Sequence, residues 1–492
     1  MTKLNDESLS HLPPGVARPG YDRSQLDVGI VHFGVGGFHR AHQAMYMDRL
    51  MNQGKALDWA ICGVGVLPQD AAMKSVMDSQ DCLYTLMLKF PDGTRAARVI
   101  GSIAEYLYAP EDPEAVIEKM ARPGTRIVSL TITEGGYSIS DTTGEFDAAT
   151  PAVAADLVPG AVPSGVFGLV TEALRRRRDR GLGAFTVMSC DNIPANGEVA
   201  RKAFGEFARL LDPELGEWVQ ANVAFPSSMV DRITPVTTEA DRALLAAEFG
   251  VEDGWPVVAE DFEQWALEDS FVQGRPAWED AGVSVTADVE PFERMKLRLL
   301  NCGHQAIAYL GYLAGYRYAH EAVADPRLAR FLLDYMDREA TPTLLPVPGV
   351  DLDAYKQRLL ERFGNEHVRD TLVRLCAESS DRIPKWLVPV VSENLAADGE
   401  VARSALIIAA WARYAEGTDE AGVPIDVVDR RREEVMQAAA RNREEPLAFV
   451  SQPHFFAGIA RDARFAGPYL AALQALHEAG ARAAVARMVE GG

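Results

Sequence analysis

The sequence predicts two domains: an α/β domain with a parallel sheet over residues 1–290, and a mainly α-helical domain over residues 291–492. The first reason is length, because 492 residues are too many for one ordinary hydrophobic core. The second is that buried-strand patterns alternate with helical patterns in the first half, which implies right-handed βαβ units. The third is that nearly all patterns after about Glu290 are helical.

Four short apolar runs in the first half are typical of buried strands of a parallel sheet. They are DVGIVHF (27–33), WAICGVGV (59–66), RIVSLTIT (126–133) and AFTVMSC (184–190). The segment 38–54 has helical spacing and is predicted to end at Gly54. Residues 1–25 are predicted to form a polar arm, because three prolines there break any helix.

The second half carries long helical patterns that are rich in alanine and leucine and have few β-branched runs. They cover residues 295–316, 327–340, 355–364 and 402–417. We therefore expect the helical domain to begin close to residue 290.

Composition narrows the class of protein and its partners. The net charge of −22 disfavours nucleic acid and anionic lipid as partners. The five cysteines form no CxxC pair and no cluster with metal-ligand spacing, so we expect no metal site and a reduced, cytoplasmic protein. The polar N-terminus lacks a signal core, and no apolar run is long enough to cross a bilayer. A monomer is compatible with these features.

A glycine-rich turn follows the first predicted strand. The pattern GxGGF covers Gly34, Gly36, Gly37 and Phe38, between that strand and the first helix. Glycines at this place let the backbone approach a dinucleotide pyrophosphate, which favours a Rossmann-like domain. The pattern lacks the third glycine of GxGxxG, and a plain tight strand-to-helix turn explains it as well.

An acidic residue after the second strand is the expected partner of the adenosine ribose of NAD. Asp70 is the candidate, although it lies further from the glycines than usual. The alternative is that Asp70 only caps the next helix. No arginine stands immediately beside Asp70 to accept a 2′-phosphate, which favours NAD over NADP.

The segment KLRLLNCGH carries the candidate chemistry. At roughly 100° per residue, Glu293, His304 and Asn301 fall within about 140° of Lys296 on one side of a helix. Dehydrogenation of an alcohol needs a base, donors to the oxyanion and a hydride acceptor. A lysine of lowered pKa can be the base, and asparagine amides can be the donors. An ordinary amphipathic helix with a surface lysine is the alternative.

The chain resembles the long-chain mannitol dehydrogenase family over nearly its whole length. Lys296, Asn301 and His304 meet the family signature of lysine, four residues, asparagine, two residues and histidine. Further matching segments follow in the family's order: IVHFGVGGFHRAHQA (30–44), SLTITEGGY (129–137), FTVMSCDNIPANG (185–197) and MVDRITP (229–235). Several long motifs in one order are far more specific than a lone glycine pattern.

The resemblance implies a role for each matching residue. Lys296 is the general base, Asn192 and Asn301 hold the reacting oxygen, His304 positions substrate or lysine, and Glu293 forms a proton path. Asp231, Arg374 and Arg382 bind polyol hydroxyls, and Glu134 lies near the nicotinamide. Each also has an ordinary explanation: a turn residue for Asn192, a surface ion pair with Arg232 for Asp231, and solvated charges for the others. Relatives often carry lysine at position 382, and two acidic residues where this chain has Gln69 and Asp70.

The implied reaction is the reversible, NAD-dependent and metal-independent oxidation of D-mannitol to D-fructose, with D-arabinitol and D-sorbitol as further substrates. NADP is less favoured, although the loss of one carboxylate at Gln69 weakens its exclusion. The expected partner is thus a small polyol or ketose. Two alternatives stay open: a hexuronate reductase of the same family, and a non-catalytic nucleotide-binding sensor.

Overall fold

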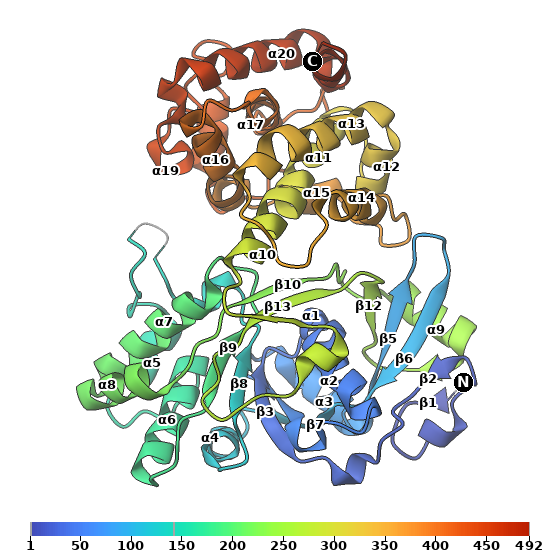
Figure 1. Ribbon diagram of the computed structural model, residues 1–492, viewed down its shortest axis with the longest axis vertical. Helices are drawn as coiled ribbons and strands as arrows, with labels where there is room; N and C mark the ends of the chain where they lie inside the picture. Colours follow the sequence, from blue (N-terminus) through green and yellow to red (C-terminus); the bar gives the residue numbers. More distant parts are fainter. Residues whose placement is uncertain (1, 141–142, 492) are drawn as a thin grey trace. The chain divides into compact units, whose positions relative to one another are not determined.

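The computed structural model of the chain describes residues 2–140 and 143–491, without the side chain of Glu134. The chain forms two compact units, Met1–Glu290 and Pro291–Gly492 (Figure 1).

A five-stranded parallel sheet lies at the centre of the N-terminal unit and confirms the predicted α/β class. Its strands, in spatial order, are β7 (Ile103–Tyr108), β4 (Ala60–Gly65), β3 (Val28–Phe33), β8 (Ile127–Leu130) and β9 (Thr186–Ser189). The chain winds from β3 to β4 and β7 on one side, and continues through β8 and β9 on the other. The winding direction therefore changes between β3 and β8, which is where open α/β sheets bind their ligands.

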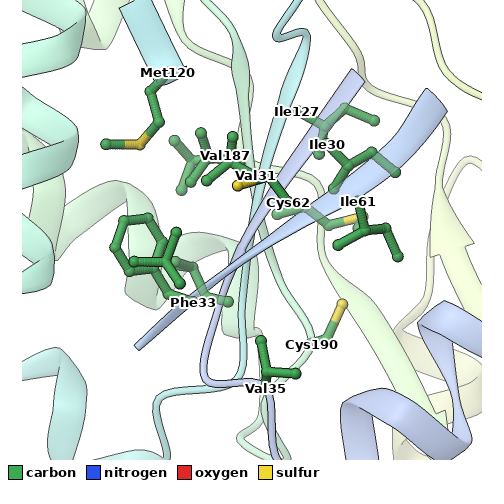
Figure 2. Packing of buried hydrophobic residues seen from close by; sticks show 14 of the residues in the cluster. Ile30, Val31, Phe33, Val35, Ile61, Cys62, Met120, Ile127, Val187 and Cys190 are labelled. Atoms are coloured by element: carbon green, nitrogen blue, oxygen red, sulfur yellow. The ribbon is translucent and has the colours of Figure 1, made fainter. Parts of the chain in front are cut away.

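Every residue of β3 and β4 is buried, at odd and even positions alike, so both faces of the sheet are covered. Figure 2 shows the result: Val31 and Phe33 of β3 lie in one apolar cluster with Cys62 of β4 and Met120 of α4 (Pro113–Ala121). Strands buried on both faces have to be apolar throughout, which is why these runs do not alternate with polar residues.

Further helices of the N-terminal unit pack around the sheet and on one another. Besides α4 they are α1 (Gly37–Ala41), α2 (Gln43–Asn52), α3 (Asp70–Ser79), α5 (Pro151–Asp156), α6 (Val166–Asp179), α7 (Asn196–Leu211), α8 (Pro213–Asn222) and α9 (Glu239–Phe249). The helix predicted over 38–54 is divided into α1 and α2, because the backbone of His42 leaves the helical conformation at φ −123° and ψ −96°.

Three further sheets of the same unit were not predicted, and two of them have more than two strands. One has the order β12 (Val257–Glu260), β5 (Tyr84–Lys89), β6 (Arg95–Ile100), β2 (Val16–Ala17), and the other β10 (Ser228–Asp231), β13 (Gln264–Glu268), β14 (Ser284–Thr286). The predicted polar arm is wrong: Leu4 and Leu12 are buried, and residues 2–3 (β1) pair with residues 251–252 (β11). Prolines excluded an α-helix there, but they did not exclude short strands or the 3₁₀ turns Leu9–His11 and Arg23–Gln25.

The C-terminal unit is helical, as predicted, and its described residues contain no β-strand. Its α-helices are α10 (Glu290–Met295), α11 (Cys302–Leu313), α12 (Ala319–Ala324), α13 (Pro326–Tyr335), α14 (Leu352–Phe363), α15 (Leu372–Cys376), α16 (Ser379–Ala396), α17 (Ala402–Tyr414), α18 (Arg432–Ala439), α19 (Pro453–Phe456) and α20 (Ala463–Glu490). Helix α11 is buried on nearly all sides, because α12, α13, α15, α17 and α20 pack around it.

Two segments of this unit are π-helices: Lys296–Asn301 (η6) between α10 and α11, and Met336–Ala340 (η7) directly after α13. A short 3₁₀ turn, Thr341–Thr343 (η8), follows the second one. Isolated π-helical turns inside α-helices are rare and frequently mark functional sites.

Candidate active site

The glycine turn after β3 is tight on one side and open on the other. Gly34 has φ +90°, and a Cβ there would lie 2.0 Å from the carbonyl oxygen of Thr131. The Thr131 hydroxyl donates to the Gly34 carbonyl at 2.6 Å. Gly36 is exposed, with no atom nearer than 3.9 Å to the position of a Cβ, and α1 begins at Gly37. The absence of a side chain at position 34 lets the turn pack against the Thr131 carbonyl, and the main chain of Gly36 is the part of the turn that is open to a ligand.

A buried histidine supports the turn from beneath, and the sequence reasoning missed it. His32 of β3 contacts the Ser129 hydroxyl at 2.8 Å through Nδ1 and the Thr131 hydroxyl at 3.0 Å through Nε2. Its ring stacks on that of His39 at a centroid distance of 3.4 Å. Burial lowers the pKa of His32 to about 3, so the ring is neutral at physiological pH. One histidine within an otherwise apolar strand was the available signal.

The loops after β8 and β9 are joined by Asp191. Its carboxylate accepts hydrogen bonds from the backbone N–H groups of Ile132 at 3.0 Å and Thr133 at 2.8 Å, and from the Tyr137 hydroxyl at 2.7 Å. Thr133 has φ +65°, a conformation that non-glycine residues rarely adopt. Asp191 therefore fixes the backbone that leads into Glu134, whose side chain lies outside the described residues.

The segment that contains Asn192 is tied to the strand that contains Asp231. Asn192 is exposed after β9, whereas Asp231 is the buried last residue of β10. Asn196 joins the two, since its amide donates to the Ser228 carbonyl at 2.7 Å and its Oδ1 accepts from the Ser228 N–H at 2.9 Å. The TEGG, SCDN and MVDR segments thus meet near the carboxyl ends of the parallel strands.

Arg232 does not form the surface ion pair with Asp231 that was the alternative explanation, because both residues are buried. Its guanidinium donates to the carbonyl oxygens of Ala41 at 2.7 Å and Glu260 at 3.0 Å, and lies 3.3 Å from Glu263. Arg232 therefore connects the MVDR segment to helix α1, which follows the glycine turn.

Asp70 lies at the carboxyl end of β4, beside Gly65. Its Oδ2 accepts hydrogen bonds from the N–H groups of Val66 and Leu67, both at 2.9 Å. The residue that caps α3 is Gln69, which makes no side-chain cap, so the proposed capping role of Asp70 is replaced by closure of the β4–α3 loop. No described group bonds to the other oxygen, Oδ1.

In the C-terminal unit, Lys296, Asn301 and His304 are all buried, with 7%, 5% and 8% of each residue exposed. Lys296 and Asn301 are the first and last residues of the π-helix, and His304 follows in α11, tilted against Phe363 at 4.2 Å between ring centroids. The uniform count of roughly 100° per residue is therefore wrong between positions 296 and 301, because a π-helix bonds i to i+5. Within the described residues, Oδ1 of Asn301 accepts no hydrogen bond. Glu293 precedes the segment, half-buried in α10.

The structure joins Arg374 and Arg382 to each other. Arg382 donates to the carbonyl oxygens of Arg374 at 3.2 Å and Leu375 at 3.3 Å. Gln305, the neighbour of His304, donates to the same Leu375 oxygen at 3.1 Å. The Arg374 guanidinium forms a two-point ion pair with Asp370, with N–O distances of 2.7 and 2.5 Å. Both arginines are thereby held close to the helix that carries His304.

Each unit thus gathers its own set of predicted residues. The N-terminal unit holds the glycine turn with half-buried Phe38, which stacks on His42, together with Asp70, Asn192 and Asp231. The C-terminal unit holds the lysine, asparagine and histidine of the signature together with the two arginines. Among residues 2–140 and 143–491, no three His, Cys, Asp or Glu side chains could hold a metal ion. Over the same residues, no helix is both long and apolar enough to cross a membrane.

Comparison with known proteins gives matches over both units. The Rossmann domain of mannitol dehydrogenase matches residues 28–280, and the mannitol dehydrogenase C-terminal domain matches residues 288–477. Mannitol 2-dehydrogenase of Phaeosphaeria nodorum is 46% identical, covering 99% of this chain and 85% of that protein. The enzyme of that name from Aspergillus fumigatus is 46% identical over 94% of both chains.

Solved structures agree. Mannitol 2-dehydrogenase of Pseudomonas fluorescens, in a ternary complex with NAD and D-mannitol, is 45% identical with a TM-score of 0.90 over 100% of both chains. A D-sorbitol dehydrogenase in substrate-free form is 39% identical, with a TM-score of 0.90, over 98% of this chain and 100% of that one. The chain therefore belongs to the mannitol dehydrogenase family of oxidoreductases.

Proposed function

We propose that this protein is a polyol dehydrogenase that interconverts D-mannitol and D-fructose with NAD as cofactor. The observation that carries the proposal is the likeness, over the whole chain, to a structure that binds NAD and D-mannitol. The lysine, asparagine and histidine of the signature are intact and buried in this chain, which argues against a non-catalytic sensor.

The N-terminal unit binds the cofactor. Gly34, Gly36, Gly37 and Phe38 lie at the sheet position where α/β folds bind dinucleotides, and the main chain of Gly36 is exposed there. Asp70 closes its loop with Oδ2 and offers Oδ1 to a ribose hydroxyl. Glu134 lies near the nicotinamide. When bound, NAD accepts the hydride from C2 of the polyol.

Side chains of the protein accept the proton of the C2 hydroxyl and stabilise the charge on its oxygen. Lys296 takes the C2 hydroxyl proton, and Asn301 and Asn192 donate amide N–H groups to the oxygen as its charge develops. The buried Oδ1 of Asn301 has no partner among the described residues, and it can accept a hydrogen bond from a hydroxyl of the ligand, because buried polar groups without a partner are costly. His304 orients the substrate or the lysine, and Glu293 passes the proton towards solvent.

Asp231, Arg374 and Arg382 bind the remaining polyol hydroxyls. A hexuronate substrate would need a cation for its carboxylate, and Arg382, which donates to carbonyl oxygens, keeps that alternative open although Arg374 is paired with Asp370. The likeness to a complex with D-mannitol favours a neutral polyol over fructuronate or tagaturonate. The substrates D-sorbitol and D-arabinitol belong to the same neutral class. The five buried cysteines fit the cytoplasmic location that the sequence predicts.

A panel of ketoses and polyols, assayed with NADH and with NADPH, tests the proposal. We expect D-fructose and NADH to give the highest kcat/KM. Higher efficiency with fructuronate would favour the hexuronate alternative, and equal efficiency with NADPH would refute the NAD preference.

The assignment of the base is tested by Lys296→Ala. Turnover at neutral pH should fall by about 10²-fold or more, because a positioned base is lost, whereas NADH binding is retained. Near-normal turnover would refute the assignment.

A further inference from the structure

The π-helix Lys296–Asn301 sets the angle between the two residues at its ends. In an α-helix, residues five apart lie about 140° apart around the axis. Hydrogen bonds from i to i+5 widen the turn, so that positions 296 and 301 lie closer together around the axis than they would in an α-helix. The π-helix therefore brings the proposed base and the proposed oxyanion donor to one side of the segment.

Arg298, in the middle of this π-helix, forms hydrogen bonds to other elements through both its side chain and its main chain. The Arg298 guanidinium, in a residue only 5% exposed, donates to the Thr343 carbonyl at 2.6 Å and forms two parallel bonds with Glu393 at 2.7 and 2.6 Å. The Arg298 carbonyl accepts from the hydroxyl of fully buried Tyr335 at 3.2 Å.

These partners come from three elements that are distant in sequence: α13, η8 and α16. A forked guanidinium–carboxylate pair fixes direction as well as distance, because both bonds must be made in one plane. The Tyr335 hydroxyl bonds to a carbonyl of the widened turn, where the regular α-helical pattern of carbonyl partners is interrupted. The π-helix thus contacts these three elements through Arg298, a residue that has no role in the proposed chemistry.

We propose that Arg298, Glu393 and Tyr335 are positioning residues that hold the π-helix and thereby set the alignment of Lys296 with Asn301. This inference rests on the proposed function of those two residues. It assigns no contact with substrate or cofactor to the three positioning residues. Their loss should slow the chemical step without weakening cofactor binding, which belongs to the other unit.

The test uses the full-length protein and two variants, each of which changes one side chain that contacts Arg298. Tyr335→Phe deletes only a hydroxyl, and Glu393→Gln removes the charge of a carboxylate whose side chain is 41% exposed. Glu400→Gln is a matched control, because Glu400 is 46% exposed and also pairs with a nearly buried arginine, Arg403, at 2.8 Å. The measurements are single-turnover D-fructose reduction across pH, NADH affinity and Tm.

We expect each test variant to lower the single-turnover rate by about 10-fold to 100-fold, the cost of misaligned catalytic groups. NADH affinity should stay within about twofold of wild type, and the pH at half-maximal rate should move because the surroundings of Lys296 change. Glu393→Asp should recover part of the rate by restoring the carboxylate. The control Glu400→Gln should match wild type in rate and pH profile.

Two results would overturn the inference: wild-type rates and pH profiles in Tyr335→Phe and Glu393→Gln, or an equal loss of rate in Glu400→Gln. Lys296→Ala is measured beside them to separate the two proposals. If Lys296→Ala keeps its activity, the base assignment itself fails. If Lys296→Ala loses activity while the two test variants keep theirs, only the positioning role fails.

Discussion

The glycine turn of the N-terminal unit and the π-helix of the C-terminal unit both depart from regular structure, but they are stabilised differently. At the turn, Gly34 adopts φ +90° against the Thr131 carbonyl, so the shape depends on the absence of a side chain. At the π-helix, none of the six residues is a glycine, and the shape depends on side chains from distant elements that bind Arg298.

The difference shows that the backbone conformation of a site can depend on consecutive residues or on residues that are distant in the sequence. A backbone conformation that only glycine adopts freely can be recognised from a few consecutive letters. A π-helix held by a buried arginine has no short pattern, because its partners lie 37 to 95 positions further along the chain. Substitutions at the glycine turn should therefore change stability and NADH binding, whereas substitutions around the π-helix should change turnover.

The largest effect is expected at the turn, from Gly34→Ala. A Cβ would collide with the Thr131 carbonyl and force a strained φ on alanine, at a cost of about 1–3 kcal/mol or more. We expect the first thermal transition to fall by about 5 °C or more and NADH binding to be lost. Gly36→Ala is the control for stability, because its Cβ would meet open space. A Gly34→Ala protein with unchanged Tm would contradict this explanation of the turn.

The next effect is expected at the π-helix, from Arg298→Lys. An ammonium keeps the charge but cannot make two parallel bonds to Glu393. Turnover should fall about tenfold or more, while NADH affinity, measured by fluorescence titration, should stay at the wild-type value. A lysine variant with full turnover would show that charge alone is sufficient and that the forked geometry is not needed.

A smaller effect is expected from Thr131→Val, which removes the hydroxyl that donates to the Gly34 carbonyl. The same hydroxyl contacts Nε2 of His32 at 3.0 Å, so two hydrogen bonds are lost. We expect a cost of about 1 kcal/mol or more, and NADH binding should weaken about fivefold or more. Thr171→Val is a matched control, since the hydroxyl of this buried threonine has no hydrogen-bond partner among the described residues. Equal NADH affinity in wild type and Thr131→Val would show that the Thr131 hydroxyl does not contribute to cofactor binding.

The smallest effect is expected from pH on the Arg298–Glu393 pair. The hydrogen bond from Arg298 holds the pKa of Glu393 below its ordinary value of 4.5. The stabilisation is therefore present above about pH 4.5 and is lost as the pH falls through the lower folded-state pKa. Glu393→Gln should lower the free energy of unfolding by about 1 kcal/mol or less at pH 7, since solvent screens the pair. Denaturant unfolding should show this difference shrinking below pH 4.5, and a constant difference would contradict the linkage.

Much of the fold could be predicted because its strongest signals are local. Four of the five strands of the central sheet lie in continuous apolar runs, and the C-terminal helices repeat their apolar residues with helical spacing. The fifth strand, β7, was not predicted. The sheets that contain β2, β10 and β12 were not predicted, because short, partly polar strands carry weak patterns and find their partners only in the folded chain. For the same reason residues 1–25 were wrongly predicted to be a polar arm.

The residues of the candidate site likewise include some that local motifs predicted and others that only the structure revealed. The sequence alone determined which residue types occur in which motifs: the glycine turn, the acidic residue after the second strand, and the lysine, asparagine and histidine of the signature. Asp191, Asn196 and His32 were missed, because they act by bonding to groups far away in the sequence. Arg298 was missed although a buried arginine in an apolar helix is a signal in itself.

Only the tertiary structure decided that Lys296–Asn301 is a π-helix. Helix periodicity is a property of backbone hydrogen bonding, and the sequence by itself favours the ordinary i to i+4 pattern. The wider turn is adopted where outside groups bind it, and here the Glu393 carboxylate and the Tyr335 hydroxyl bind at Arg298. The sequence therefore determined that a lysine and an asparagine stand five positions apart, and the folded chain determined the type of helix that sets the angle between them.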